Sequence, residues 1–253
     1  MEPSVKTRRP YDSRRRREQA AQTRRDIEAA ANTLFRERGY VGTSMPAIAS
    51  SAGVVVETIY RAFGSKAGLF KAVMEAALAG GSKRAEAPPE ERSAIRAVIE
   101  ETDPRRKLEL YAATQPGVHG RSGPLYRVLV AAADSDPALR EVLDGIEARR
   151  LHGLGAFAGQ LAESRALRAD LPVDQAGDII WTLCSPAVHH LLVGARGWTS
   201  ETYQHWLAAA LQHELLDESG DSRKTDVVHR EAGLCGVSEE LASDFEGILI
   251  SQA

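Results

Sequence analysis

The sequence predicts an all-α protein in two parts, and three observations carry that prediction. Apolar residues recur at helical spacing along most of the chain, and no segment shows the alternation typical of strands. Ala, Leu, Glu and Arg, which favour helices, are abundant, whereas aromatic residues make up only 6% of the 253 residues. The first third of the chain is basic and the remainder is acidic, which indicates two separate roles.

The composition limits the classes of protein to which the chain can belong. Hydrophobic residues make up 43% and charged residues 26% of the sequence, as in globular proteins, so a wholly disordered chain is excluded. No run of about 18 apolar residues is present to span a membrane, and no apolar stretch follows the basic N-terminus as in a secretory signal. Cys184 and Cys235 are too few for a disulfide framework or a Cys-rich zinc site, so we expect a cytoplasmic protein.

The charge asymmetry predicts that the N-terminal third contacts a polyanion. Residues 1–80 hold 14 Lys and Arg against 8 Asp and Glu, whereas the remaining 173 residues hold 18 against 27. Part of the basic charge is concentrated in one run that precedes the first predicted helix: Arg14, Arg15, Arg16 and Arg17. We expect residues 1–22 to be a flexible basic arm. The alternative is a charged face that is merely solvated.

The next segment has the signals of three helices followed by a fourth. A helix is predicted from about Thr23 and ends at Gly39, and Thr43-Ser44 then offers a cap for a short helix that Gly53 stops. A second short helix follows up to Phe63, and a fourth helix starts after Ser65. Two short helices joined by a glycine turn are the plan of a helix-turn-helix, in which the second helix can enter the major groove of DNA.

The rest of the chain is also predicted to be helical. A loop is expected from Ala79 to Arg92, and a Pro/Gly-rich break from Pro116 to Pro124. The predicted helices are Ser93–Glu101, Lys107–Thr114, Leu125–Ala133, a long helix starting at Pro137, Val173–Val193 and Thr199–Leu216. Residues 217–253 are expected to be a disordered tail with a weakly helical end, to which we assign no function.

These residues resemble the tetracycline-repressor (TetR) family of bacterial transcription regulators. The similarity covers about Arg24 to Arg84 and is carried by Thr43-Ser44, Ile48-Ala49, Ala52-Gly53-Val54, Thr58-Ile59-Tyr60, Phe63, Ser65-Lys66 and Leu69-Phe70. A weaker similarity to one branch of the family lies in Ile179-Ile180-Trp181-Thr182-Leu183, Gly197-Trp198 and Tyr203-Gln204-His205-Trp206-Leu207.

The resemblance implies a homodimeric regulator without a cofactor. Residues 23–84 would be the DNA-binding domain, and each subunit would place one recognition helix on a half-site of a near-palindromic operator. Residues 85–216 would hold a pocket for a small, lipophilic effector and the dimer contact. Effector binding would lower the affinity for the operator, and repression is the family's usual outcome.

The candidate DNA-binding residues lie in and around the helix-turn-helix. Thr43 and Lys66 are expected to bind phosphate, Ser44 to cap its helix, and Tyr60 to reach a phosphate from the small core. Glu57, Thr58 and Arg61 are expected to face outward and to read bases or bind phosphate. For Lys66 the alternative is a solvated side chain, for Tyr60 a structural ring, and for Glu57 a pair with Arg61 or plain solvation.

Three positions depart from the family pattern. Glu57 stands where a small residue is common, Val55 stands where a serine cap is common, and Ala62 replaces a frequent aromatic phosphate-binder. Val55 would instead offer a methyl contact to a base. The basic arm at Arg14 to Arg17 would compensate for the contacts that are lost.

Six residues of the larger part are candidates for the ligand pocket: Tyr111, Gln115, His119, Trp181, Cys184 and His189. His189, His190 and His205 also suggest a metal site or an all-α enzyme. Adjacent histidines on a helix diverge and no zinc-like spacing or catalytic motif is present, so we expect neither. A second alternative keeps the DNA-binding module but makes the protein constitutive or regulated by another protein.

Overall fold

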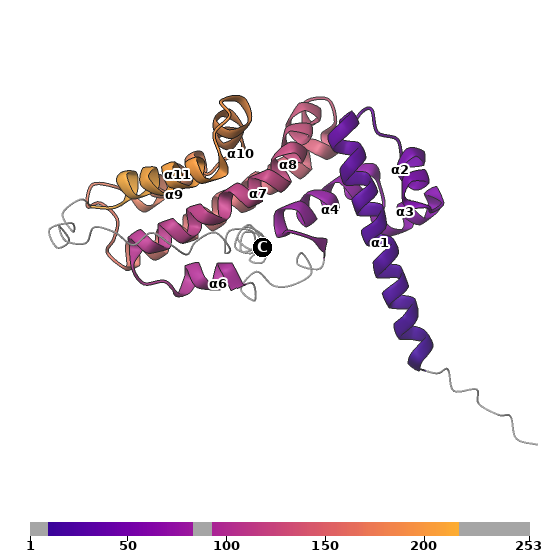
Figure 1. Cartoon of the computed structure of the whole chain (residues 1–253), viewed down its shortest axis with the longest axis horizontal. Helices are drawn as coiled ribbons and strands as arrows, with labels where there is room; N and C mark the ends of the chain where they lie inside the picture. Colours follow the sequence, from indigo (N-terminus) through magenta and orange to yellow (C-terminus); the bar gives the residue numbers. More distant parts are fainter. Residues whose placement is uncertain (1–9, 83–92, 218–253) are drawn as a thin grey trace, which may run out of the picture. The chain divides into compact units, whose positions relative to one another are not determined.

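A computed structural model describes residues 10–82 and 93–217, with the side chains of residues 10–14, 93 and 94 left aside (Figure 1). These residues form helices, and within them the sole β-type pairing is an isolated bridge between Leu167 and Leu216. The all-α prediction is therefore confirmed. The chain divides into two compact units between Val73 and Met74, inside one helix, and each unit is described by itself.

The first unit contains three helices and the start of a fourth. They are α1 (Pro10–Arg38), α2 (Met45–Ala52), α3 (Val56–Phe63) and the first part of α4 (Lys66–Ala79). Their small core is built around three aromatic rings. Phe35 stacks on Tyr40 with ring centroids 5.8 Å apart, and the edge of Phe70 meets both rings, at 4.9 Å from Phe35 and 5.7 Å from Tyr40.

Helix α1 starts earlier than the sequence predicted. Residues 10–22, which were assigned to a flexible arm, are helical, whereas residues 1–9 lie outside the described part of the chain. The prediction relied on the lack of apolar residues to bury, and residues 15–20 are indeed exposed. Good helix formers sustain an exposed helix that a packed segment already nucleates, and Gln22 Nε2 donates to Asp26 Oδ1 at 2.8 Å along it. Pro10 at the first position costs the helix no hydrogen bond.

The second unit holds the end of α4 and the remaining helices. They are α6 (Ser93–Glu100), α7 (Pro104–Ala133), α8 (Pro137–Glu163), α9 (Val173–Leu183), α10 (Pro186–His189), the π-helix η2 (His190–Ala195) and α11 (Ser200–Leu215). The predicted starts at Ser93 and Pro137 are confirmed, and α11 begins one residue after its predicted start, because the Thr199 side chain caps it. Residues 218–253, with the predicted tail and Cys235, are outside the described ranges.

The predicted break between Pro116 and Pro124 is wrong, because α7 runs through both prolines for 30 residues. A proline inside a helix removes one hydrogen bond and costs about 3 kcal/mol. Burial offsets that cost here, since Val118, Leu125 and Leu129 on this stretch are completely buried. Packing of one face of α7 therefore overrides the local preference of the prolines.

The predicted helix Val173–Val193 is in fact three elements. Helix α9 ends at Leu183, and α10 begins at Pro186 under a new cap, where the N–H of Val188 donates to Ser185 Oγ at 3.2 Å. After four residues the α-helix becomes the π-helix η2. The Ser-Pro pair is a common start signal for a helix, and it marks the break that the apolar pattern concealed.

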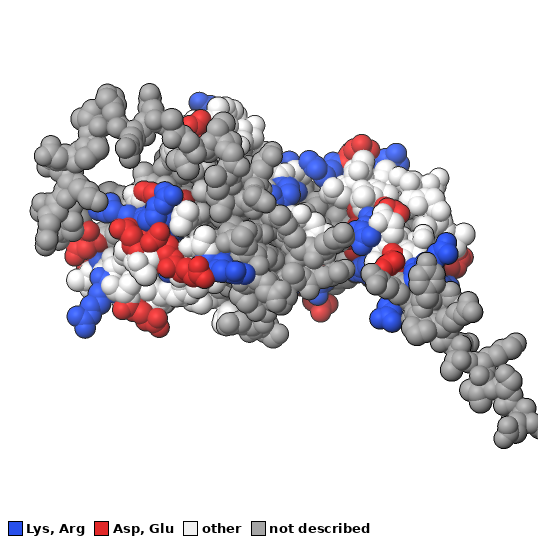
Figure 2. Space-filling view, turned by 60° about the horizontal axis from the view of Figure 1, so that its bottom comes forward, with Lys and Arg blue, Asp and Glu red and all other residues white. Residues whose placement is uncertain are grey.

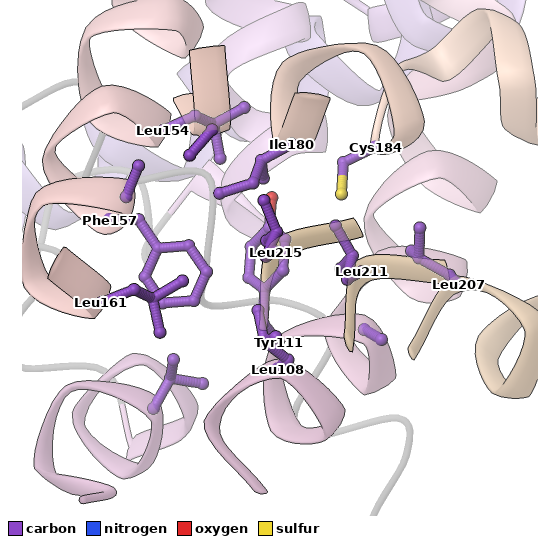
Figure 3. Close-up of a cluster of buried hydrophobic side chains, with 14 of the residues drawn as sticks. Leu108, Tyr111, Leu154, Phe157, Leu161, Ile180, Cys184, Leu207, Leu211 and Leu215 are labelled. Atoms are coloured by element: carbon purple, nitrogen blue, oxygen red, sulfur yellow. The ribbon is translucent and has the colours of Figure 1, made fainter. Parts of the chain in front are cut away.

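The core of the second unit lies between α7, α8, α9 and α11 (Figure 3). Figure 3 shows Tyr111 of α7 among Ile180, Leu211 and Leu215, while Phe157 of α8 lies beside Leu161. The rings of Tyr111 and Phe157 have centroids 5.1 Å apart. The small residues Ala176 and Gly177 allow α9 to lie close to α8. A Cβ atom at Gly177 would lie only 3.3 Å from the Cα atom of Gly155.

Candidate nucleic-acid interface and ligand site

The turn between α2 and α3 is fixed by local hydrogen bonds. The N–H of Ala47 donates to Ser44 Oγ at 3.3 Å, so Ser44 caps α2 as predicted. Gly53 ends α2 with a φ of +66°, a left-handed conformation that favours glycine, and the N–H of Val54 donates to the carbonyl of Ala49. These bonds set the direction in which α3 leaves the turn.

Helix α3 buries one face and leaves the other open. Ile59 is completely buried, whereas Glu57 and Arg61 are exposed and 49% of the surface of Tyr60 remains accessible. Thr58 is half-buried. The described residues show no ion pair between Glu57 and Arg61, so the pairing alternative for Glu57 lacks support. Contacts of these side chains with DNA stay a prediction.

Thr43 does not present its hydroxyl to a phosphate, which corrects the sequence prediction. The residue is only 1% exposed, and its Oγ1 lies 2.7 Å from the Gly39 carbonyl oxygen and 3.0 Å from that of Leu34. The hydroxyl donates toward the carbonyl of Gly39, just beyond the end of α1, and toward that of Leu34 in its last turn. Thr43 therefore stabilises the link between α1 and α2.

Val55 stands at the N-cap of α3 without a side-chain hydrogen bond, and 64% of its surface is exposed. Replacing Val55 by Ser should add the missing cap and raise the free energy of unfolding of the first unit by about 1 kcal/mol. Urea denaturation measures the change, with Val41→Ser as a matched control because Val41 is 85% exposed in a loop. An equal gain in both variants would contradict the capping argument.

Arg24 on α1 holds the end of α3, a role that the sequence did not reveal. Its NH1 donates to the carbonyl oxygen of Ala62 at 3.0 Å, and the guanidinium lies 4.2 Å from the centroid of the Phe63 ring. Its Nε is 3.0 Å from Glu28 Oε1. A cation at the C-terminus of a helix is favourable, so Arg24 fixes both the end and the orientation of α3.

Lys66 begins α4 next to the predicted cap. The N–H of Gly68 donates to Ser65 Oγ at 2.9 Å, and Lys66 Nζ lies 4.2 Å from the centroid of the Tyr40 ring. The ammonium is thus half-buried against an aromatic face rather than free in solvent. Its contact with a phosphate stays a prediction.

The basic run lies along α1. Arg15, Arg16 and Arg17 are exposed on this helix, and Arg14 is within its bounds although its side chain is not described. Figure 2 shows one face of the molecule, on which Lys and Arg lie next to Asp and Glu rather than in one continuous basic patch.

Residues 27–73 match the family model described as bacterial regulatory proteins, tetR family. These residues form a helix-turn-helix domain of the TetR type. The match spans the buried face of α1, the whole of α2 and α3, and the part of α4 that belongs to the first unit. It confirms the resemblance that the sequence suggested.

Solved structures share the fold over both units. NalD, the secondary repressor of the MexAB-OprM multidrug efflux pump in Pseudomonas aeruginosa, is 23% identical; the match covers 79% of this chain and 99% of NalD with a TM-score of 0.63. The regulator FadR from Bacillus subtilis, solved with stearoyl-CoA, is 19% identical; the match covers 75% of this chain and 97% of FadR with a TM-score of 0.60. No curated protein gives a significant match.

Beyond the TetR-type domain, the structure brings several of the predicted pocket residues together. Tyr111, Gln115, His119 and Cys184 are buried, and His189 is half-buried with its ring centroid 5.1 Å from that of His119. Burial raises the pKa of the Cys184 thiol to about 12, and a hydrogen bond with Tyr111 opposes that rise. Cys184 is therefore a neutral thiol.

Trp181, the sixth predicted pocket residue, packs against the core that contains Tyr111 and Cys184, and its role in a pocket stays a prediction. Its Nε1 donates to Glu147 Oε2 at 3.0 Å, and Glu147 also accepts from Tyr126 and pairs with Arg150 at 2.8 Å each. The ring of Trp181 lies 4.8 Å from the guanidinium of Arg150, which in turn donates to the Trp181 carbonyl. The residue thus belongs to a polar network that joins α7, α8 and α9.

Tyr203 is the buried-site residue that the sequence did not assign to the pocket. It is completely buried, and its ring meets that of His189 edge-on at 4.9 Å. The Tyr203 hydroxyl has no hydrogen-bond partner among the described residues, and the one polar neighbour of the His119 ring there is the backbone of Cys184. An unsatisfied buried donor or acceptor costs about 1–3 kcal/mol, so these atoms mark a site that lacks a polar partner.

Two histidines of this unit are held in the neutral form. Burial lowers the pKa of His119 well below its ordinary value; repulsion from His189, when that residue is protonated, and from Arg150 adds to the shift, and a hydrogen bond with the Cys184 backbone opposes it. Burial also lowers the pKa of His189 to about 4, with smaller effects from His190 and Arg127. In the unfolded chain both imidazoles bind a proton near pH 6.5. The stability that depends on them is complete above that pH and is lost as the pH falls toward 4.

We therefore expect acid to destabilise the second unit, and His189→Gln to remove part of that dependence. Between about pH 6.5 and 4 the variant should lose less stability than the native chain, by on the order of 1 kcal/mol after discounting for solvent screening. Urea denaturation at several pH values measures this difference. His152→Gln is the control because His152 is exposed, and an equal flattening by both variants would count against the assignment.

Within residues 10–82 and 93–217, no group of three or more His, Cys, Asp or Glu is placed to hold a metal ion. None of the helices in these ranges is both long enough and apolar enough to cross a membrane. His205 is exposed on α11.

Proposed function

We propose that the chain is a homodimeric transcription regulator, a repressor, that binds a near-palindromic operator through α3 and is released by a small molecule. The observation that carries the proposal is the open face of α3. Ile59 packs one face of α3 into the core, and Arg24 holds the C-terminal end of the helix. The exposed face of α3 therefore has a fixed orientation within the first unit. An α-helix held in this way fits the major groove of DNA.

The residues of that face have separate roles. We assign base contacts to Thr58 and Arg61, since an arginine can pair with the O6 and N7 atoms of guanine. Tyr60 and Lys66 supply phosphate contacts on either side of the groove. Glu57 either accepts from a cytosine amino group or stays solvated, and the exposed Val55 touches a base methyl group.

The second unit supplies the response to the effector. The buried polar cluster around His119 lies in an apolar core, which suits a mainly lipophilic molecule. The similar protein FadR was solved with stearoyl-CoA, and NalD is a repressor, so the fold is compatible with both properties.

Selection of bound sequences from random duplex DNA tests the operator proposal. The expected product is an inverted repeat whose two half-sites lie about one helical turn apart, bound by a dimer. Sedimentation of the purified protein with and without that duplex gives the number of chains in each complex. If the protein enriches no sequence and ignores duplex DNA at low salt, the proposal is wrong.

Salt dependence tests the basic run. Adjacent residues of a helix point about 100° apart, so only one or two of Arg15, Arg16 and Arg17 can reach the same duplex. Replacing all three by Ala should reduce the magnitude of the log–log salt slope of operator binding by about 1–2, at about 0.9 for each lost phosphate contact. Fluorescence anisotropy over a range of salt concentrations measures it, with the exposed Arg105→Ala of α7 as the control. An unchanged slope would show that α1 does not contact phosphate.

A further inference from the structure

The buried atoms without partners in the second unit lie on two neighbouring helices. His119 of α7 is 1% exposed and Tyr203 of α11 is completely buried, and the ring of His189 contacts both of their rings. A neutral imidazole offers one donor and one acceptor, and a phenol hydroxyl offers both. Because the backbone of Cys184 serves at most one nitrogen of His119, the other ring nitrogen and Tyr203 Oη could together bind one polar group that both donates and accepts.

The surroundings of this pair exclude a charged group. Burial keeps His119 neutral, and the same burial would remove the water shell of a charged ligand group. Arg150, whose charge acts on both His119 and Tyr203, already pairs with Glu147 and donates to the Trp181 carbonyl. Around the pair the core is apolar, with Leu207, Leu211 and Ile180 among its fully buried members (Figure 3).

The segment that contacts the pair is a short α-helix that passes into a π-helix. His189, which contacts both rings, ends the four-residue helix α10, and the π-helix η2 follows it directly. The π-helix is rare and is frequently found at functional sites. No residue of η2 is fully buried: Leu191 is 60% exposed, and Leu192 and Val193 are only partly buried against the core. Less packing therefore opposes an outward movement of η2 than opposes one of a fully packed helix.

We propose that His119 and Tyr203 bind an uncharged hydroxyl or amide group of a mainly apolar effector, which enters by displacing the segment Pro186–Ala195. The proposal rests on the proposed function, because it names the chemical class of the effector. The polar group of the ligand satisfies the orphaned atoms, and its apolar body replaces core contacts around α9 and α11. The affinity comes from filling hydrogen bonds that the ligand-free protein leaves unmade.

A series of ligands with one alkyl chain and different head groups tests the chemical class. The probes are n-octanol, octanamide, sodium octanoate and octyltrimethylammonium, and binding is followed by titration calorimetry at neutral pH. Octanol and octanamide should bind at least about tenfold more tightly than the two charged probes, because a charged head group would lose its water shell in the buried site. A tenfold difference in Kd corresponds to ~1.4 kcal/mol. The proposal is overturned if neither octanol nor octanamide binds, or if octanoate binds more tightly than the other three probes.

Two variants test the residues. Tyr203→Phe removes only the hydroxyl, and His119→Leu removes both ring nitrogens. Each should raise the Tm of the ligand-free protein by a few degrees, ~2–4 °C, because an unsatisfied polar group is lost, and each should weaken octanol binding at least about tenfold. His152→Leu, on the exposed surface of α8, should change neither quantity.

A fall in Tm together with unchanged octanol binding would show that the two side chains are structural, and would overturn the assignment. Operator binding is measured on the same variants. If the native protein fails to bind any duplex but binds octanol through His119 and Tyr203, the proposed function is wrong while the ligand site stands. If the native protein binds its operator but neither octanol nor octanamide, the ligand site is wrong while the proposed function stands.

Discussion

Replacing Glu147 by Leu is expected to lower the free energy of unfolding of the second unit by about 3–5 kcal/mol. The carboxylate of Glu147 accepts from three groups on three helices: Tyr126 of α7, Arg150 of α8 and Trp181 of α9. Arg150 is 6% exposed, so the substitution leaves a buried guanidinium without its counter-ion. The indole N–H and the phenol hydroxyl lose their acceptor at the same time.

Urea denaturation of the full chain measures the loss. Glu147→Gln should recover part of it, because an amide oxygen still accepts one hydrogen bond while the NH₂ group faces the donors of Arg150 and Trp181. Arg140 lies on the same helix as Glu147, and Arg140→Leu breaks an exposed pair with Asp134 at the end of α7, so it should cost less than about 1 kcal/mol. Similar losses at positions 140 and 147 would mean that the network is no more than a set of surface contacts.

The sequence predicted the helix-turn-helix because its signals are local. Ser44, Gly53 and Ser65 each fix the start or end of a helix through bonds to residues within a few positions, and the apolar spacing around Ile59 is that of a helix with one buried face. Such features depend on neighbours in the chain and can be read without a fold. The limits of α2 and α3 therefore follow the prediction closely.

The features that the sequence did not predict depend on partners far along the chain. Pro116 suggests a break, and only the buried face of α7 explains why the helix continues. In the sequence, Arg24 is one of many basic residues. Its role depends on the Ala62 carbonyl, which lies 38 residues further along the chain, and on the Phe63 ring. Glu147 and Arg150, three residues apart, have the spacing of an ordinary surface pair.

The burial of Thr43 has a related cause. A threonine before a capping serine, next to a basic segment, has the residue type and position of a phosphate ligand. The side chain instead donates toward the carbonyls of Gly39 and Leu34, because the site is closed to solvent and a buried hydroxyl needs a partner inside the protein. Which of two acceptors a hydroxyl meets is decided by the packing of α1 on α2.

Replacing Phe70 by Ala is expected to destabilise the TetR-type domain by about 3–5 kcal/mol. Phe70 is completely buried and meets the rings of both Phe35 and Tyr40, so its removal leaves a cavity at the centre of a small core. A domain of this size has about 5–15 kcal/mol in total, and the loss would leave the domain largely or partly unfolded. Operator binding should fall with it, although Phe70 lies inside the core and not on the open face of α3.

The two units should respond differently to this change. Because the core of the second unit shares none of these rings, its unfolding in urea should be unchanged, and the transition of the variant should separate into two steps. Phe70→Leu, which keeps most of the volume, is the matched control and should retain most of the stability and operator binding. A single transition shifted as a whole would mean instead that the α4 helix, which crosses the division at Val73, makes the two units unfold together.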